Sequence, residues 1–252
     1  MALITGARTG LGYDLSNVYA ANGFDVVGLG HRLPSGDEFW QKHNFYQLDL
    51  SRAQEEDFQA VTKGIAGKVG QLDTLILNAG INCVGPFEKK NWEEQRAVLD
   101  INYHATVSLC RILLQNGNLQ SGSKIVFISS LADDVGYPGA SVYAASKLAL
   151  SAYARSLKAA LKKGGISVSW VKPGPIDTPH AEKYSPLKDN SKNRYPAERL
   201  AQEIFAFSQN SNGAFVPGFS TKIISLIGRF APRFATKLMR KILFIPLLKA
   251  LK

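Results

Sequence analysis

Hydrophobic residues occur along the chain in short continuous runs, separated by longer segments with a helical spacing of apolar positions. The first run is residues 2–4, and the next segment reads as a helix that ends near Asn22-Gly23. Further strand-like runs are 24–30, 45–48, 74–78, 124–129, 166–171 and 214–216. Further helix-like segments are 53–69, 91–117, 141–162 and 196–209. This alternation predicts an α/β fold, a parallel sheet covered by helices on both faces.

The chain has 252 residues, which suits a single α/β domain with one growing core. No internal repeat, low-complexity stretch or linker occurs before residue 217. We therefore expect one catalytic domain over residues 1–217, followed by an extension over 218–252.

The extension differs from the rest of the chain in pattern and charge. Apolar residues recur there every three or four positions, at Ile223, Ile227, Phe230, Phe234, Leu238 and Ile242. Residues 213–252 carry eight lysines and arginines and no acid, and these account for all but two units of the net charge of +10. The pattern predicts basic amphipathic helices, interrupted by Pro232 and Pro246. Its uncharged run 242–248 is far too short for a membrane span of about 20 residues.

A glycine-rich turn joins the first strand to the first helix. Its sequence is Thr5-Gly6-Ala7-Arg8-Thr9-Gly10-Leu11-Gly12. Glycines let the backbone approach a phosphate closely, and the amino end of a helix favours an anion. The strand-to-helix position predicts that this turn binds the phosphates of a nucleotide.

Tyr143 and Lys147 are one helical turn apart in Tyr143-Ala144-Ala145-Ser146-Lys147. Residues i and i+4 share one face of a helix, so Lys147 can lie beneath the Tyr143 ring. A fixed cation there is expected to lower the pKa of the phenol and make it an acid–base group. Ser130 ends the run 124–130, at the carboxyl edge of the sheet where ligands bind. A loop serine that only caps a neighbouring segment is the alternative for Ser130 alone.

These residues together resemble the short-chain dehydrogenase/reductase family, whose Thr-Gly-x-x-x-Gly-x-Gly spacing the glycine turn follows. The resemblance covers residues 2–217 and implies a Rossmann-like, doubly wound parallel sheet. Leu77-Asn78-Ala79-Gly80 is similar to the Asn-Asn-Ala-Gly motif of the family, with leucine in place of the first asparagine. The resemblance implies a catalytic set of Asn102, Ser130, Tyr143 and Lys147. Asn102 would anchor a water linked to Lys147, a role that fits a locally widened helix at this residue.

The resemblance also implies which residues contact the nicotinamide cofactor. They are Gly6, Arg8, Thr9, Gly10, Leu11, Gly12, His31, Arg32, Asp49, Leu50, Asn78, Ala79, Gly80, Tyr143, Lys147, Pro173, Gly174, Ile176 and Thr178. Asp49 would lie near the adenine, and the Pro173-Gly174 segment would hold the nicotinamide end.

Gly30-His31-Arg32 follows the second strand, where an enzyme that prefers NAD usually carries an acidic residue. The first carboxylate after this point is Asp37. Arg32, with Arg8 in the glycine turn, can instead pair with a 2′-phosphate. A solvated loop arginine is the alternative, but the sequence favours NADP(H) over NAD(H).

The expected function is reversible hydride transfer between NADP(H) and a carbonyl or secondary alcohol. Tyr143 would exchange the proton, Ser130 would polarise the carbonyl, and Lys147 would hold the ribose. The alternative is a protein that senses NADP(H) or scaffolds a complex without turnover. The loop 180–195 is expected to contact the substrate and to order on binding, but no residue in it specifies the substrate. The family resemblance implies a homodimer or homotetramer that forms through helices such as 91–117 and 141–162.

Composition narrows the remaining partners. Cys83 and Cys110 give no disulfide framework and no metal-ligand spacing, so we expect no metal. The glycine turn begins at residue 5 and leaves no room for a signal peptide, so we expect a cytoplasmic protein. Three alternatives stay open for residues 219–252: a structural arm, peripheral contact with an anionic membrane, and nucleic-acid binding. The third is disfavoured because no nucleic-acid motif accompanies the basic residues.

Overall fold

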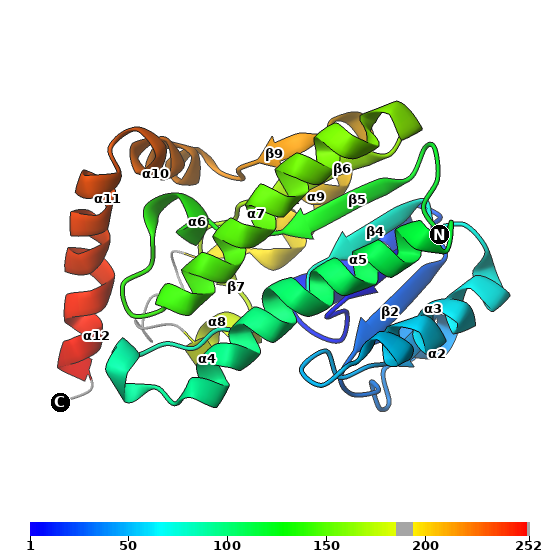
Figure 1. Ribbon diagram of the computed structural model, residues 1–252, viewed down its shortest axis with the longest axis horizontal. Helices are drawn as coiled ribbons and strands as arrows, with labels where there is room; N and C mark the ends of the chain where they lie inside the picture. The colour runs from blue at the N-terminus through cyan, green and yellow to red at the C-terminus, as the bar shows by residue number, and fades with distance from the viewer. Residues whose placement is uncertain (185–193, 251–252) are drawn as a thin grey trace.

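The computed structural model describes residues 1–184 and 194–250, which form a seven-stranded sheet between two helical layers (Figure 1). The strand order is β3-β2-β1-β4-β5-β6-β9, and every neighbouring pair is parallel. The strands are β1 (Ala2–Thr5), β2 (Val26–Gly30), β3 (Asn44–Gln47), β4 (Thr74–Leu77), β5 (Lys124–Ile128), β6 (Ser167–Val171) and β9 (Gly213–Phe215). The predicted doubly wound α/β fold is therefore confirmed.

Two hydrophobic cores cover the two faces of the sheet because successive strand residues point to opposite sides. Leu3 lies in the core formed with α3 (Glu55–Val69), α5 (Thr106–Gln115) and α7 (Ser141–Leu161). Its neighbours Ala2 and Ile4 lie in the other core, with α1 (Leu11–Ala21), α2 (Glu38–Lys42) and α9 (Ala197–Asn210). Burial on both faces explains why the strands read as continuous apolar runs.

The predicted helix 91–117 is divided into three parts. They are α4 (Trp92–Leu99), the π-helix η2 (Asp100–Ala105) and α5. The predicted widening at Asn102 is thus confirmed, and it lies within one continuous helical rod rather than at a break.

Several short elements carried no clear sequence signal. They are α2, η1 (Phe87–Lys89), α6 (Ala132–Val135), η3 (Lys162–Gly164), α8 (Pro179–Tyr184) and the two-residue pair β7 (Ile176–Asp177) and β8 (Tyr195–Pro196). Of the predicted substrate loop 180–195, residues 185–193 lie outside the described residues.

The C-terminal extension forms α10 (Phe219–Phe230), α11 (Pro232–Met239), the π-helix η5 (Arg240–Phe244) and α12 (Ile245–Ala250). Pro232 separates α10 from α11, as predicted, and it occupies the first turn of α11, where its missing N–H costs nothing. Pro246 does not end a helix as predicted: it is the second residue of α12, which follows the π-turn η5 directly. These helices stand at one end of the molecule, where α10 and α11 pack on α6 (Figure 1).

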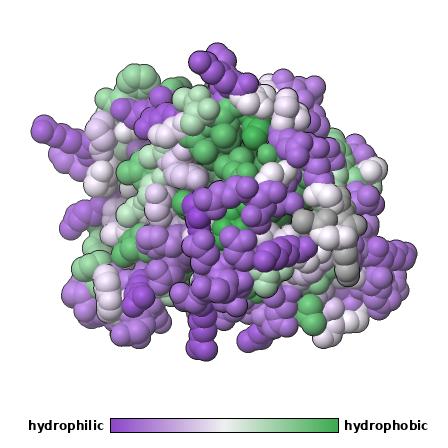
Figure 2. Space-filling model, turned by 45° about the vertical axis from the view of Figure 1, so that its right-hand side comes forward, coloured by the Kyte–Doolittle hydropathy of each residue, from purple (hydrophilic) through white to green (hydrophobic). Residues whose placement is uncertain are grey.

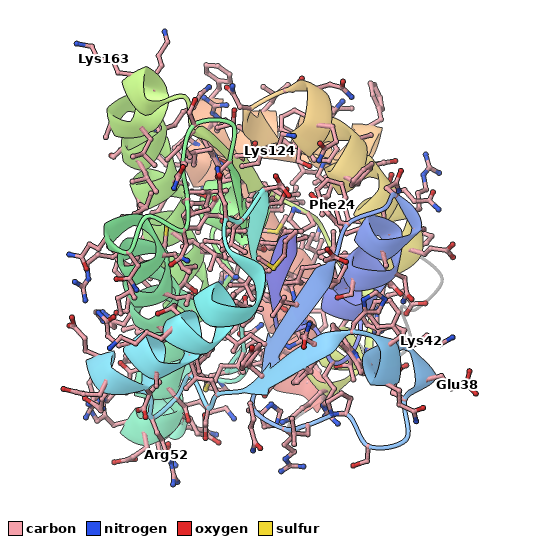
Figure 3. All side chains as sticks on the ribbon, turned by 90° about the vertical axis from the view of Figure 1, so that its right-hand side faces the viewer. Phe24, Glu38, Lys42, Arg52, Lys124 and Lys163 are labelled. Atoms are coloured by element: carbon pink, nitrogen blue, oxygen red, sulfur yellow. The ribbon has the colours of Figure 1, made fainter. Side chains whose placement is uncertain are left out.

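The surface is mixed in polarity. The face in Figure 2 is largely hydrophilic, with hydrophobic side chains gathered in its upper central part. Figure 3 shows charged side chains such as Glu38, Lys42 and Lys163 projecting outward from the helical layers. No helix within residues 1–184 and 194–250 is long and apolar enough to span a bilayer.

Candidate active site

The topology makes a crevice beside β1, where the chain order along the sheet changes direction. The buried Thr5 hydroxyl, at the carboxyl end of β1, accepts the backbone N–H groups of Asn78 and Ala79, each at 2.9 Å. The Asn78 amide in turn donates to the Thr5 carbonyl at 3.0 Å. These bonds hold the glycine turn against the segment that follows β4, so two of the predicted motifs meet at this crevice.

The glycine turn has a backbone conformation and a close packing that only glycine allows. Gly6 and Gly10 have φ of 65° and 56°, in the left-handed region. A Cβ on Gly12 would lie 2.2 Å from the Gly6 carbonyl oxygen. No side chain caps the amino end of α1, so its N–H groups can face an anion. A Cβ on Gly10 would lie 3.2 Å from the Thr178 side chain, which brings the predicted nicotinamide segment to the same place.

These residues fit the dinucleotide that the fold implies. The bare helix end suits the pyrophosphate, and the backbone of the glycine turn can approach it without obstruction. His31 and Arg32 are exposed on the loop after β2, so their side chains are free to reach the adenosine ribose of a cofactor. Arg8 is partly buried in the glycine turn.

The other predicted cofactor residues also lie at the carboxyl ends of strands. Gly80, Pro173, Gly174 and Ile176 are buried or partly buried, whereas Thr9 and Asp49 are exposed, and Leu50 is partly buried after β3. The Asp49 carboxylate accepts the N–H and hydroxyl of Ser51 at 3.0 and 2.7 Å. These bonds lower the pKa of Asp49 and orient its side chain within its own loop.

Tyr143 and Lys147 lie together on α7, with the Lys147 Nζ atom 5.8 Å from the centroid of the Tyr143 ring. Lys147 is buried, and its Nζ donates to the Ile128 carbonyl at the end of β5 at 2.8 Å. Burial lowers the pKa of Lys147 to about 8, and the charge of Asp133 opposes this shift. Tyr137 packs edge-on against Tyr143 at 6.4 Å between ring centroids.

We expected Lys147 to lower the pKa of Tyr143, and this prediction is wrong: the groups of the protein raise it. Burial raises the pKa of Tyr143, a hydrogen bond with Ser130 acts to lower it, and Asp133 raises it. The ammonium group is turned to the Ile128 carbonyl beneath the ring rather than to the phenol oxygen. The phenol is therefore held in its protonated form, which is the form of a proton donor.

Ser130 lies just after β5, and its hydroxyl accepts the backbone N–H of Ala132 at 3.1 Å, at the start of α6. This bond is the capping contact that the sequence offered as the alternative, and it orients the serine side chain. Ser130 also acts to lower the pKa of Tyr143, so the two side chains lie near each other.

Asn102 is fully buried in the π-turn η2, and its amide is held on both sides. The Asn102 Oδ1 atom accepts the Ile81 N–H at 2.8 Å, and Nδ2 donates to the Ile81 carbonyl and to the Ser146 hydroxyl, each at 3.0 Å. A Cβ on Gly80 would lie 3.1 Å from Asn102 Oδ1 and 3.4 Å from Lys147 Nζ. Gly80 thus permits Asn102 and Lys147 to lie side by side.

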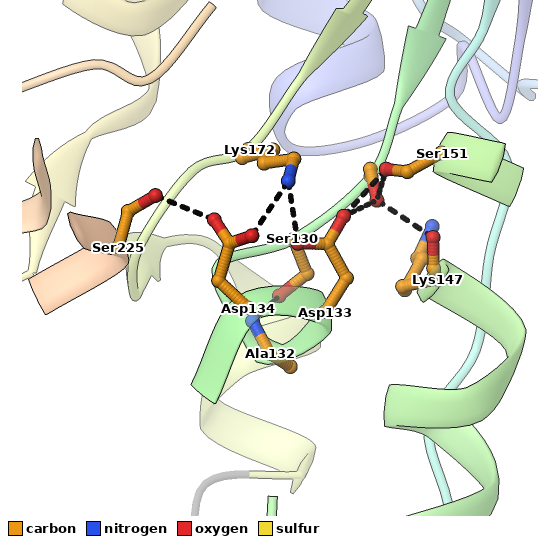
Figure 4. A network of polar contacts seen from close by, with 9 residues as sticks. Ser130, Ala132, Asp133, Asp134, Lys147, Ser151, Lys172 and Ser225 are labelled. Carbon is orange, nitrogen blue, oxygen red and sulfur yellow. Dashed lines mark hydrogen bonds and ion pairs between the residues drawn. The ribbon is translucent and has the colours of Figure 1, made fainter. Parts of the chain in front are cut away.

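A buried network of charges beside this site was missed in the sequence (Figure 4). Lys172 Nζ lies 2.9 Å from Asp133 Oδ1 and 2.8 Å from Asp134 Oδ1. The side chains of Asp133 and Asp134 are 0% and 8% exposed. Asp133 also accepts the hydroxyls of Ser129 and Ser151, and Ser129 donates to the Lys147 carbonyl at 3.0 Å. The network therefore connects the ends of β5 and β6 with α7, which carries Tyr143 and Lys147.

The available sequence signal for this network was the adjacent pair Asp133-Asp134, three residues after Ser130, with Lys172 before Pro173. In a sequence, charged residues beside a strand end are interpreted as solvated loop residues, and only the fold shows that they are buried. Among the residues that the structure describes, no group of three or more His, Cys, Asp or Glu side chains could hold a metal ion.

A glycine turn at the switch point, with a tyrosine, a lysine and a serine at the same sheet edge, defines a dinucleotide-binding oxidoreductase fold. The family model of the short chain dehydrogenases matches residues 1–189. The dehydrogenase/reductase SDR family member 7B of Rattus norvegicus is 30% identical over 95% of this chain and 80% of its own. The NADPH-dependent 1-acyldihydroxyacetone phosphate reductase of Saccharomyces cerevisiae is 31% identical over 80% of this chain and 69% of its own.

The crystal structure of a short-chain dehydrogenase from Streptomyces avermitilis has the same fold, with a TM-score of 0.78 over 95% of each chain and 24% sequence identity. The chain belongs to the short-chain dehydrogenase/reductase family and is an oxidoreductase of the class that acts on CH–OH and C=O groups.

Proposed function

We propose that this protein is an NADP(H)-dependent oxidoreductase that interconverts a carbonyl and a secondary alcohol, with Tyr143 as the acid–base group. The observation that carries the proposal is the convergence of Ser130, Tyr143 and Lys147 on one edge of the sheet. Lys147 donates to the last carbonyl of β5, Ser130 lies just after β5, and Ser130 is close enough to Tyr143 to lower its pKa. The glycine turn lies at the same edge, two strands along the sheet.

When bound, the nicotinamide cofactor supplies or accepts the hydride. Tyr143 gives its proton to the carbonyl oxygen in the reductive direction, and its raised pKa keeps that proton in place until it is needed. Ser130 donates a hydrogen bond to the same oxygen and polarises the carbonyl. Lys147 holds the ribose through its ammonium group, and Asp133 favours the charged form of that group against burial. Asn102, held by its bonds with Ile81 and Ser146, would anchor a water that links Lys147 to solvent.

The preference for NADP(H) rests on Arg32, His31 and Arg8. Arg32 is exposed after β2, and Arg8 lies in the glycine turn, so both guanidinium groups can approach a phosphate on the adenosine ribose. Asp37, the nearest acid after this point, is engaged as the cap of α2, where it accepts the Phe39 N–H at 2.9 Å. The yeast relative, whose name states NADPH dependence, supports the same cofactor.

The proposed division of the chain is a catalytic unit of residues 1–217 with the extension 218–252. We also propose a cytoplasmic homodimer or homotetramer that forms through α4, α5 and α7. The exposed Trp92 and Leu148 on α4 and α7, at 63% and 55%, support such an interface. Light scattering of the purified protein tests the assembly.

The test of the reaction is cofactor turnover with a panel of carbonyl compounds that includes 1-acyldihydroxyacetone phosphate. NADPH and NADH oxidation are followed separately, for the natural chain and for Tyr143→Phe. Tyr103→Phe is the matched control, because the Tyr103 ring packs edge-on against Tyr153 and the core rather than against Tyr143. Turnover that Tyr143→Phe removes and Tyr103→Phe keeps supports the proposal. Tight NADP(H) binding without turnover of any compound would instead identify a sensor or scaffold protein.

A further inference from the structure

The helix α10 carries large apolar residues on its exposed side as well as on its inner side. Its buried residues are the small Thr221, Ser225 and Gly228, and Ile224 and Ile227 pack partly buried against the cluster around Val135. Four large apolar residues point outward: Phe219 is 79% exposed, Ile223 43%, Leu226 51% and Phe230 82%. At 100° per residue these four positions fall within one narrow stripe, opposite the buried side.

Close packing against α6 explains the small inner side. A Cβ on Gly228 would lie 2.4 Å from the Asp134 carbonyl oxygen, so α10 approaches the backbone of α6 directly. The Ser225 hydroxyl donates to the Asp134 carboxylate, at the end of the buried network. The orientation of α10 is therefore fixed by its inner contacts, and the apolar stripe cannot turn inward without breaking them.

Exposed apolar side chains gather in this part of the molecule. Of the eleven large hydrophobic residues that are exposed in the described ranges, seven lie in 219–248. Beyond α10 they are Phe234, Ile242 and Leu248. The extension also buries its own set against α6, with Ala235 and Met239 in a cluster with Val135. The inner side of the extension is thus already packed against protein. The exposed apolar residues are a second set, separate from that packing.

The charges that residues 219–248 themselves carry are all of one sign. Lys222 and Arg229 flank the stripe on α10, and Arg233, Lys237, Arg240 and Lys241 continue the series on α11 and η5. All six are exposed, and none lies in an ion pair within the part of the chain that the structure describes. Residues 213–252 contain no acid that could oppose them.

We propose that the outer surface of residues 219–248 binds an anionic lipid membrane, with the α10 stripe inserted among the headgroups. Aromatic and aliphatic side chains between lysines and arginines suit a surface that is negatively charged outside and apolar beneath. A second copy of the chain fits poorly, because a two-fold contact would place this cationic surface against itself. Nucleic acid offers phosphates but no apolar layer for Phe219 and Phe230. The inference does not depend on the reaction proposed above.

Cosedimentation of the full chain with lipid vesicles tests the proposal. The vesicles are pure phosphatidylcholine or a mixture of phosphatidylcholine and phosphatidylserine, at low and high salt. We expect binding to the phosphatidylserine vesicles alone, weakened by salt because surface charge is screened over about 10 Å at 0.1 M. Lys222→Gln with Arg229→Gln should lower the partition constant about thirtyfold, from the contribution of two basic residues near an anionic surface.

Phe219→Ser with Phe230→Ser should lower the same constant by about tenfold or more, because two aromatic rings no longer insert. Leu33→Ser is the matched control: Leu33 is 56% exposed after β2, near the opposite edge of the sheet from β9, which precedes α10, and its loss should leave vesicle binding unchanged. All changed residues are exposed, so circular dichroism and the thermal midpoint should not change.

Three results would overturn the inference. The first is absence of vesicle binding, and the second is equal binding to neutral and anionic vesicles. The third is a Phe219→Ser, Phe230→Ser protein that binds vesicles as the natural chain does, while the Leu33→Ser protein does not. Loss of a dimer in the phenylalanine variant, without vesicle binding, would assign the stripe to a second copy. Retention on DNA that the lysine and arginine changes remove, again without vesicle binding, would assign the surface to nucleic acid.

Discussion

Replacing Lys172 by methionine tests the buried network beside the active site. Lys172 is the only cation in contact with Asp133 and Asp134 among the described residues, at 2.9 and 2.8 Å. Methionine keeps most of the volume of the side chain and removes the charge. Two buried carboxylates then lose the cation in contact with them, since the remaining hydrogen-bond partners of Asp133 are the neutral hydroxyls of Ser129 and Ser151.

The expected loss is large for a single substitution. Removing one partner of a buried ion pair costs about 3–5 kcal/mol, because an uncompensated charge stays in the interior. The free energy of unfolding of a typical domain is about 5–15 kcal/mol, so this loss is a substantial part of the total. Lys124→Met is the matched control, because Lys124 is also partly buried but donates to a neutral group, the Gln209 amide oxygen, at 2.6 Å. Its expected cost is about 1 kcal/mol, the net worth of a hydrogen bond.

The loss should depend on pH. Burial already raises the pKa of Asp133 from 3.8, and Lys172 opposes the shift. An acid whose pKa is higher in the folded state binds extra protons on folding, so the fold loses stability as the pH rises from the unfolded pKa through the folded one. Without Lys172 the folded pKa rises further. The deficit of Lys172→Met relative to the natural chain should therefore be smaller at about pH 5 than at about pH 8.

Urea unfolding followed by circular dichroism at these two pH values measures the effect. The reasoning is refuted if Lys172→Met is no less stable than Lys124→Met, or if its deficit is larger at the lower pH. A Lys172→Met chain that also carries Asp134→Asn should recover part of the loss, because one of the two uncompensated carboxylates is removed.

Tyr143→Phe should keep the fold and cofactor binding and lower kcat by about 10²–10⁴-fold, the usual contribution of a positioned proton donor; steady-state rates check this, and an unchanged rate contradicts the proposed acid–base role. Arg32→Ala should reduce the preference for NADPH over NADH by about tenfold or more, because a charge-assisted bond to the 2′-phosphate is lost. Titration of both cofactors measures it, and equal weakening of the two would make Arg32 a solvated loop residue. Gly228→Ala should lower the thermal midpoint and expose α10 to limited proteolysis, because its Cβ would lie 2.4 Å from the Asp134 carbonyl oxygen. Gly164→Ala is the control, since a Cβ there meets nothing within 4 Å.

The sequence by itself determined the features that depend on local pattern. Continuous apolar runs marked the strands because both faces of a parallel sheet are buried, as Ala2, Leu3 and Ile4 show by alternating between the two cores. The glycine turn was recognisable because its backbone conformation requires glycine at Gly6 and Gly10. The spacing of Tyr143 and Lys147 was sufficient to place both on one face of α7.

Only the tertiary structure decided the electrostatics around these residues and the orientation of the extension. The pKa of Tyr143 is raised rather than lowered, because burial and Asp133 act on it and Lys147 is turned to the Ile128 carbonyl. The burial of Asp133 results from packing between β5, α6 and α7, which no local pattern describes. The sequence showed the helical spacing of the apolar residues in α10, but it did not show which side of the helix faces solvent. Small residues allow close approach to α6, so the helix packs through Ser225 and Gly228, with Ile224 and Ile227 beside them, and leaves Phe219, Ile223, Leu226 and Phe230 outside.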